Sequence, residues 1–175
     1  MKTVDGGSVR ELVQSGLARL SPGARARITE LGIPLDGKIA ATYPATAWAG
    51  CVAVMAEDMF PSLDPIEAQR KLAHLRIGEV AGSWRGRALF AVSKLAGRER
   101  ALEKFVHGLR RATNYLETRF TVVAPRHYEV WLSEVTGVPG FFLGMIEAAA
   151  GRFASDPAPI RIASRDGDAC TYEIG

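Results

Sequence analysis

Apolar residues recur every three or four positions over most of the chain before residue 110, a spacing that places them on one face of a helix. The clearest case lies between two prolines, where one face carries Trp48, Cys51, Val52, Met55 and Met59. The spacing predicts helices over residues 9–20, 22–32, 44–60, 65–80, 83–97 and 98–109. We therefore expect an N-terminal helical bundle.

Residues with special conformations mark where several of these helices begin and end. Ser8 and Glu11 have the spacing of a capping box, in which each side chain satisfies a free backbone amide at the helix start. Pro22 suits the first position of the second helix, where its missing N–H has no partner to lose. Gly32 can adopt the left-handed conformation that ends helices.

The periodicity changes after residue 117, where the chain becomes rich in β-branched and aromatic residues. Residues 118–123 and 127–132 predict one hairpin, and residues 159–164 and 169–174 predict a second around the turn Asp166-Gly167. Between them, Pro139 opens a helix that runs to Phe153. Helices segregated from antiparallel strands define the α+β class. We predict one domain over residues 1–175, a helical bundle followed by a four-stranded antiparallel sheet with one helix inserted between two hairpins.

Length, composition and charge are those of an ordinary globular protein. The 175 residues suit one core, and 47% of them are hydrophobic. The net charge is only +3, and acidic residues accompany the basic ones, which is typical of a solvated surface and argues against nucleic-acid binding. No apolar run approaches the ~18 residues of a transmembrane helix, and the N-terminus lacks an apolar signal segment. We expect a cytoplasmic protein with Cys51 and Cys170 as free thiols.

The sequence lacks recognised catalytic motifs. It has no phosphate-binding loop, dinucleotide fingerprint, nucleophile elbow or zinc-protease helix. Glu57 and Asp58 are adjacent, but neighbouring helical side chains point about 100° apart and do not face a common atom. His74, His107 and His127 lie far apart in sequence, without a second metal ligand at helical spacing. We therefore expect neither enzyme activity nor a metal site.

The segment 137–144 is rich in glycine and apolar side chains and opens a helix. Its two aromatic residues either line a ligand cavity or a partner surface, or they belong to a tightly packed connection between loop and helix. A ligand cavity is lined mainly by apolar and aromatic side chains, which other helix faces would also supply. The candidate ligand-binding residues are Trp48, Met55, Phe141, Phe142 and Met145.

Five short segments, spread over nearly the whole chain, form a distinctive set: Gly32-Ile33-Pro34-Leu35-Asp36, Tyr43-Pro44-Ala45-Thr46-Ala47-Trp48, Gly86-Arg87-Ala88-Leu89, Thr113-Asn114-Tyr115-Leu116-Glu117-Thr118-Arg119 and Gly137-Val138-Pro139-Gly140. Together they resemble a paralogous family of myxobacterial proteins of about this length. The resemblance implies a family of unknown function and therefore no particular activity.

The order of the elements, with a closing strand Gly167-Asp168-Ala169-Cys170-Thr171-Tyr172-Glu173-Ile174, gives a second resemblance. Both features are similar to the ligand-binding fold of 4-vinyl-reductase-type sensor domains, TRAPP Bet3-like subunits and haem nitric-oxide-binding domains. That resemblance implies three alternatives: haem gas sensing, a lipid or small aromatic ligand in an apolar cavity, or protein scaffolding.

The haem alternative depends on residues that the resemblance identifies. Such haem sensors hold the iron with a helical histidine before the sheet, and His107 occupies a comparable place. They also bind the haem propionates through a Tyr-x-Ser-x-Arg strand motif. Here Trp131 and Val135 flank Ser133, and an apolar side chain cannot replace a guanidinium that pairs with a carboxylate. We therefore expect no cofactor, with haem disfavoured and His107 a metal ligand only if haem is present.

The expected function is a non-catalytic sensory or regulatory module that binds an apolar small molecule or lipid between the helices and the sheet. The alternative is a ligand-free interaction domain, a scaffold or adaptor, that acts as a homodimer. The two hypotheses differ in where large apolar side chains lie, because the second requires a contiguous exposed patch.

Overall fold

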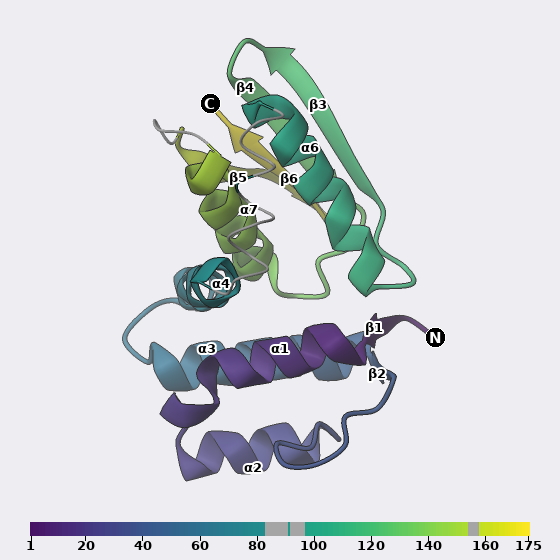
Figure 1. Cartoon of the computed structure of the whole chain (residues 1–175), viewed down its shortest axis with the longest axis vertical. Coiled ribbons are helices and arrows are strands. Elements are labelled where there is room, and N and C mark those ends of the chain that lie inside the picture. Colours follow the sequence, from purple (N-terminus) through teal and green to yellow (C-terminus); the bar gives the residue numbers. More distant parts are fainter. Residues whose placement is uncertain (83–90, 92–96, 154–157) are drawn as a thin grey trace.

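The computed structural model describes residues 1–82, 91, 97–153 and 158–175 (Figure 1). Its helices are α1 (Gly6–Gly16), α2 (Pro22–Glu30), α3 (Ala45–Met59), α4 (Pro65–Gly82), α6 (Arg98–Leu109) and α7 (Pro139–Phe153). Its strands are β1 (Thr3–Asp5), β2 (Thr42–Pro44), β3 (Thr118–Ala124), β4 (His127–Leu132), β5 (Ile160–Asp166) and β6 (Ala169–Ile174). Short 3₁₀ turns, η1 (Leu17–Arg19) and η2 (Arg110–Ala112), follow α1 and α6. The predicted α+β class is confirmed.

The larger sheet has four antiparallel strands in the order β3-β4-β6-β5. Each hairpin contributes its second strand to the centre, where Val130 of β4 lies opposite Tyr172 of β6. Alternate residues of both central strands are buried, as a sheet with one covered face requires. The two predicted hairpins and the helix between them are confirmed, with β4 and β6 at their predicted residues.

The helices form two groups on either side of α4 (Figure 1). α1, α2 and α3 lie together at the N-terminal end of the molecule, beside the short β1–β2 ribbon. α6 and α7 lie against the sheet, while α4 packs along α7 and also contacts α3 and α1. This arrangement brings the N-terminal helices against the C-terminal half of the chain.

The β1–β2 ribbon is not predicted by the sequence pattern. Val4 pairs with Tyr43 in the ribbon and also forms a bridge with Thr113, just before β3. The Asn114 side chain accepts a hydrogen bond from the Thr3 amide at 2.8 Å and donates one to the Met1 carbonyl at 3.1 Å. These bonds tie the N-terminus to the C-terminal half of the chain.

The predicted capping box of α1 is wrong, because the helix begins at Gly6 and Asp5 caps it. The Asp5 carboxylate accepts hydrogen bonds from the Ser8 amide at 3.0 Å and from the Ser8 hydroxyl at 2.6 Å. The β1 strand ends at Asp5 and so places this carboxylate over the first helical turn. Glu11 takes no part in the cap and instead pairs with Arg76 of α4.

Other helix ends agree with their sequence signals. α2 has Pro22 at its first position, and Gly32 follows the helix with φ of +80°. The predicted helix over residues 83–97 falls almost entirely on residues 83–90 and 92–96, which lie outside the described part of the chain.

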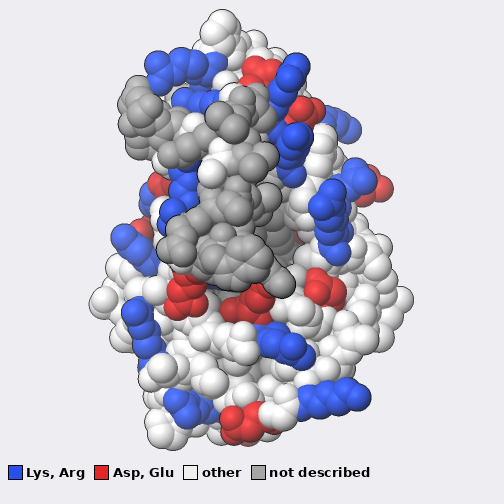
Figure 2. All heavy atoms as spheres, viewed as in Figure 1, with Lys and Arg blue, Asp and Glu red and all other residues white. Residues whose placement is uncertain are grey.

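Charged side chains of both signs are interspersed over the face shown in Figure 2. This is the surface that mixed charges along the helices predict. Among the described residues, none of the helices combines the length and the apolar character needed to cross a bilayer.

Candidate ligand pocket

A pocket of about 730 Å³ lies where the N-terminal helices meet the C-terminal half. Side chains of α1, α3, α4, α6, η2 and α7 line it. Its volume lies within the roughly 300–1,000 Å³ typical of sites for small molecules and cofactors.

Three aromatic side chains form an apolar wall of the pocket. Trp48 of α3 meets Phe141 in an edge-to-face contact with ring centroids 5.7 Å apart, and its ring lies 5.9 Å from that of Phe142. Met145, one helical turn further along α7, lines the same pocket. The structure thus brings together Trp48, Phe141, Phe142 and Met145, four of the five predicted ligand-binding residues. That they bind a ligand stays a prediction.

Met55, the remaining residue of that set, is not among the side chains that line the pocket. It is fully buried, with its Sδ atom 3.8 Å from Cys51 Sγ and its methyl group packed against Gly16 of α1. Met55 shares a helix face with Trp48 but lies seven residues, or roughly 10 Å, further along the helix axis. The apolar face of α3 thus extends beyond this pocket, and a role for Met55 in binding a ligand stays a prediction.

The start of α7 is fixed by close packing on α4. The Gly140 amide donates to the buried Gln69 side chain at 3.1 Å. Gly140 and Gly144 approach the backbone of Ile66 and Arg70 so closely that a Cβ atom at either glycine would overlap it. The two phenylalanines of α7 are thereby held beside Trp48. Segment 137–144 is therefore a tightly packed connection whose aromatic residues also line a pocket, and their binding of a ligand stays a prediction.

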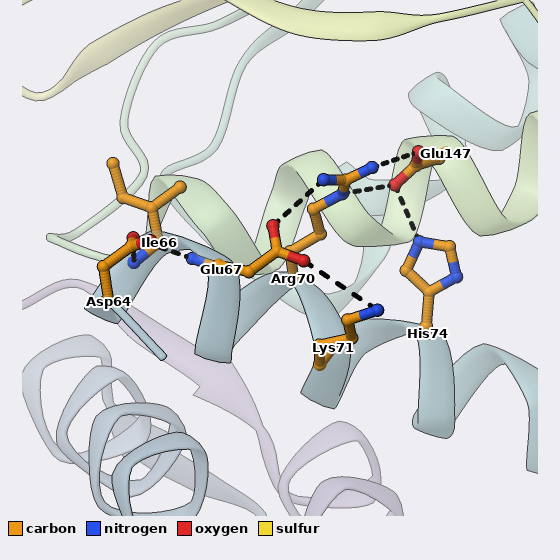
Figure 3. Close-up of polar contacts among 7 residues, drawn as sticks. All are labelled: Asp64, Ile66, Glu67, Arg70, Lys71, His74 and Glu147. Atoms are coloured by element: carbon orange, nitrogen blue, oxygen red, sulfur yellow. Dashed lines mark hydrogen bonds and ion pairs between the residues drawn. The ribbon is translucent and has the colours of Figure 1, made fainter. Parts of the chain in front are cut away.

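An ion-pair cluster also joins α4 to α7 (Figure 3). Arg70 donates from Nε and Nη2 to the two carboxylate oxygens of Glu147, at 2.6 and 2.5 Å. His74 Nε2 lies 2.8 Å from Glu147 Oε2, and Glu67 accepts a further bond from Arg70 at 3.0 Å. Hydrogen bonding from Arg70, with a smaller contribution from His74, lowers the pKa of Glu147.

We expect Glu147→Gln to reduce the pH dependence of stability. Because the folded protein lowers the pKa of Glu147 below its usual 4.5, the stability it contributes is present above 4.5 and is lost as the pH falls through the folded pKa. The unfolding free energies of wild type and Glu147→Gln, from urea titrations, should differ at pH 7 and converge in acid. Glu57→Gln removes an exposed ion pair with Arg27 and should change the unfolding free energy little at any pH. If the difference in unfolding free energy between wild type and Glu147→Gln stayed constant with pH, Glu147 would not be the source of the pH dependence.

The charged side chains around the pocket are mostly basic. Lys104 and His107 line it from α6, Arg111 from η2 and Arg76 from α4. Among the described lining residues, Glu11 is the only carboxylate. Its Oε2 atom lies 2.9 Å from Arg76 Nη2. The pocket thus combines an apolar wall with an excess of cationic groups and one imidazole.

The other chemically reactive residues lie away from the pocket. His127 pairs with Glu173 of β6 at 3.1 Å. Cys51 and Cys170 are both buried and free, and burial raises the pKa of the Cys51 thiol to about 12. Within the part of the chain that the structure describes, no three His, Cys, Asp or Glu side chains gather in a group able to hold a metal ion.

The sequence profile of a family described as proteins of unknown function (DUF2378) matches residues 2–175. The chain belongs to this family. No curated protein sequence is significantly similar to it. Membership confirms the expected family of unknown function, and the myxobacterial origin stays a prediction.

Solved structures show that the DUF2378 chain has the fold of H-NOX domains. The H-NOX protein from K. algicida in the unliganded Fe(II) state has a TM-score of 0.69 and 13% identity, with 97% of this chain and 95% of that chain covered. An oxygen-binding H-NOX domain related to soluble guanylate cyclases has a TM-score of 0.65 and 13% identity, covering 97% and 92%. A structure solved to study how porphyrin distortion modulates haem redox potential has a TM-score of 0.67 and 12% identity, covering 97% of each chain.

These similarities correct the sequence-based expectation about cofactors. The expectation of no cofactor, with haem disfavoured, is wrong because the similar structures are H-NOX domains, a family in which haem distortion is itself studied. The expectation rested on the missing tyrosine and arginine of a single strand segment. The resemblance to haem nitric-oxide-binding domains is confirmed for the fold, and those to vinyl-reductase-type and TRAPP proteins stay predictions.

Proposed function

We propose that the DUF2378 chain is a non-catalytic sensory domain that binds haem in this pocket, with the His107 imidazole as a ligand of the iron. The observation that carries the proposal is an imidazole at an aromatic-walled pocket of about 730 Å³, in a chain with the H-NOX fold. Bound haem would supply an iron atom at which small gases coordinate. The protein's own residues would hold the group, with His107 at the exposed side of α6.

The residues around the pocket fit a flat, mainly apolar group. Trp48, Phe141 and Phe142 offer ring faces and edges against which a macrocycle can pack. Burial of such a group stabilises the complex by about 25 cal/mol per Å² of apolar surface removed from water. Histidine is the commonest protein ligand for metals, and His107 is the histidine that lines this pocket.

Residues 131, 133 and 135, which correspond to the propionate-binding strand motif, do not line the pocket. The Trp131 ring lies 5.2 Å from the Arg119 guanidinium, and the Ser133 hydroxyl accepts a hydrogen bond from the Glu117 amide at 2.8 Å. Val135 is buried in the core, and these three residues are absent from the pocket lining. The acidic edge of haem would instead meet basic groups of the helices.

Titration of the purified chain with ferric haem tests the proposal. We expect one haem per chain, a Soret band that differs from that of free haem, and a native mass that exceeds the denatured mass by one haem. A naturally bound small molecule would appear as extra mass before any haem is added. Absence of a saturable spectral change, with the native mass of the chain alone, would overturn haem binding.

Gly108→Leu should block haem binding without destabilising the fold. Gly108 lines the pocket, and a Cβ atom built on it meets no heavy atom of the described residues within 4 Å, so a leucine side chain can extend into the open space. Leucine is also a better helix former than glycine, by up to about 1 kcal/mol. The matched control is Gly78→Leu on α4, where a Cβ atom likewise meets no heavy atom within 4 Å and which does not line the pocket, both as far as the described residues go. Equal haem affinity in the two variants, measured by absorbance titration, would place the site elsewhere.

A homodimeric interaction domain is the second candidate function. Val122 and Val123 of β3 are 48% and 53% exposed, on an edge strand of the sheet. Edge strands offer unpaired backbone groups to a second chain. Sedimentation of the haem-free chain tests this alternative, because a monomer at high concentration would contradict it.

A further inference from the structure

Arg76 is a nearly buried cation at the pocket. Its side chain is only 12% exposed, and it lines the pocket from α4 beside Ile77. The ion pair with Glu11 uses one guanidinium nitrogen, Nη2, and the Glu11 side chain is 60% exposed. A guanidinium carries five N–H donors in a fork that suits two oxygens of one acid group.

The balance of charge around the pocket also favours an anion. Within the described part of the chain, neither Lys104 nor Arg111 has an ion-pair partner, and Glu11 is the single carboxylate of the lining. Burial lowers the pKa of Arg76, whereas the Glu11 carboxylate acts in the opposite direction. An anionic group of a ligand would compensate the buried charge better than a carboxylate that is largely in water.

We propose that Arg76 binds an acidic group of the pocket's ligand, and that this group replaces the Glu11 carboxylate as the ion-pair partner of Arg76. The ligand class is therefore an apolar, aromatic or macrocyclic molecule with a carboxylate or a comparable oxyanion. This inference rests on the proposed function, because it concerns a ligand in the same pocket. It does not require that the ligand be haem. In haem, the acidic group would be a propionate.

Two dyes with the same aromatic frame and different charge test the assignment: anionic anilinonaphthalene sulfonate and neutral N-phenylnaphthylamine. We expect wild type to bind the sulfonate more tightly than the neutral dye, as measured by fluorescence titration. Arg76→Met should weaken sulfonate binding about 10–100-fold, the loss expected when a hydrogen bond to a charged group is removed. Binding of the neutral dye should not change, which shows that the variant keeps its pocket.

Two control variants distinguish Arg76 from a general effect of charge. Lys104→Met removes an exposed cation of the same pocket and should weaken sulfonate binding by less than about fivefold. Glu11→Gln removes the competing carboxylate and should strengthen sulfonate binding. Equal losses for both dyes in Arg76→Met, or weaker sulfonate binding in Glu11→Gln, would overturn the exchange.

The outcomes separate this proposal from haem binding. If haem fails to bind but the dyes behave as expected, the haem proposal is wrong and the anion site stands. If haem binds and Arg76→Met keeps the wild-type preference for the sulfonate, the anion site alone is wrong. If wild type binds neither dye, the anion site is overturned.

Discussion

His107→Ala is expected to weaken haem binding and to change the absorbance spectrum of the complex that remains. The apolar wall would still attract the macrocycle, but the iron would lose its protein ligand. Substitutions of groups that merely orient a metal ligand already cost roughly 10–100-fold in affinity, so removal of the ligand should cost at least as much. Absorbance titration of the variant with ferric haem measures both effects.

The other two histidines provide matched controls for this change. His74 lies in the ion-pair cluster with Glu147, and His127 pairs with Glu173, so both lie away from the pocket lining. His74→Ala and His127→Ala should therefore keep the wild-type Soret band and affinity. A wild-type spectrum in His107→Ala, or its loss in either control, would contradict the assignment of His107.

Gly144→Ala should lower the free energy of unfolding by about 1–3 kcal/mol, the usual cost of overpacking a tight contact. A Cβ atom at Gly144 would overlap the Arg70 backbone and lie 2.9 Å from the Ala73 Cβ atom. Backbone atoms of a helix cannot give way as the end of a flexible side chain can. The α4–α7 contact, which holds the aromatic wall, would have to open.

Gly151→Ala is the control on the same helix. Its Cβ atom would meet no heavy atom of the described residues within 4 Å, so the gain in helix propensity should raise stability by up to about 1 kcal/mol. Urea denaturation of both variants gives the comparison. Equal changes in the two unfolding free energies would show that α7 does not depend on this close approach.

Most of the fold follows from local patterns in the sequence. A helix or strand with one buried face has apolar residues at a regular spacing, as the alternation over His127–Leu132 shows. That spacing is visible within a short stretch of sequence. The β1–β2 ribbon could not be predicted, because its short strands are held by partners far along the chain, such as Asn114. The capping box at Ser8 failed for the same reason, since the ribbon places Asp5 at the helix start.

The pocket was predicted only in part. The aromatic residues of α3 and α7 stand out in the sequence because each lies on a strongly apolar helix. Arg76 does not, since α4 carries several basic residues, and only the tertiary contacts bury this one while Arg70 joins the cluster with Glu147. The composition of the pocket therefore depends on which helices meet, which neither spacing nor motif reveals.

The most direct measurement of haem ligation by this chain uses His107→Gly, which leaves space for a free imidazole beside the iron. The absorbance spectrum of the variant–haem complex is recorded before and after imidazole is added. We expect the spectrum to differ from wild type without imidazole and to return to the wild-type form when imidazole occupies the vacated position. A variant whose spectrum matches wild type before imidazole is added would contradict the role of His107 as the ligand of the iron.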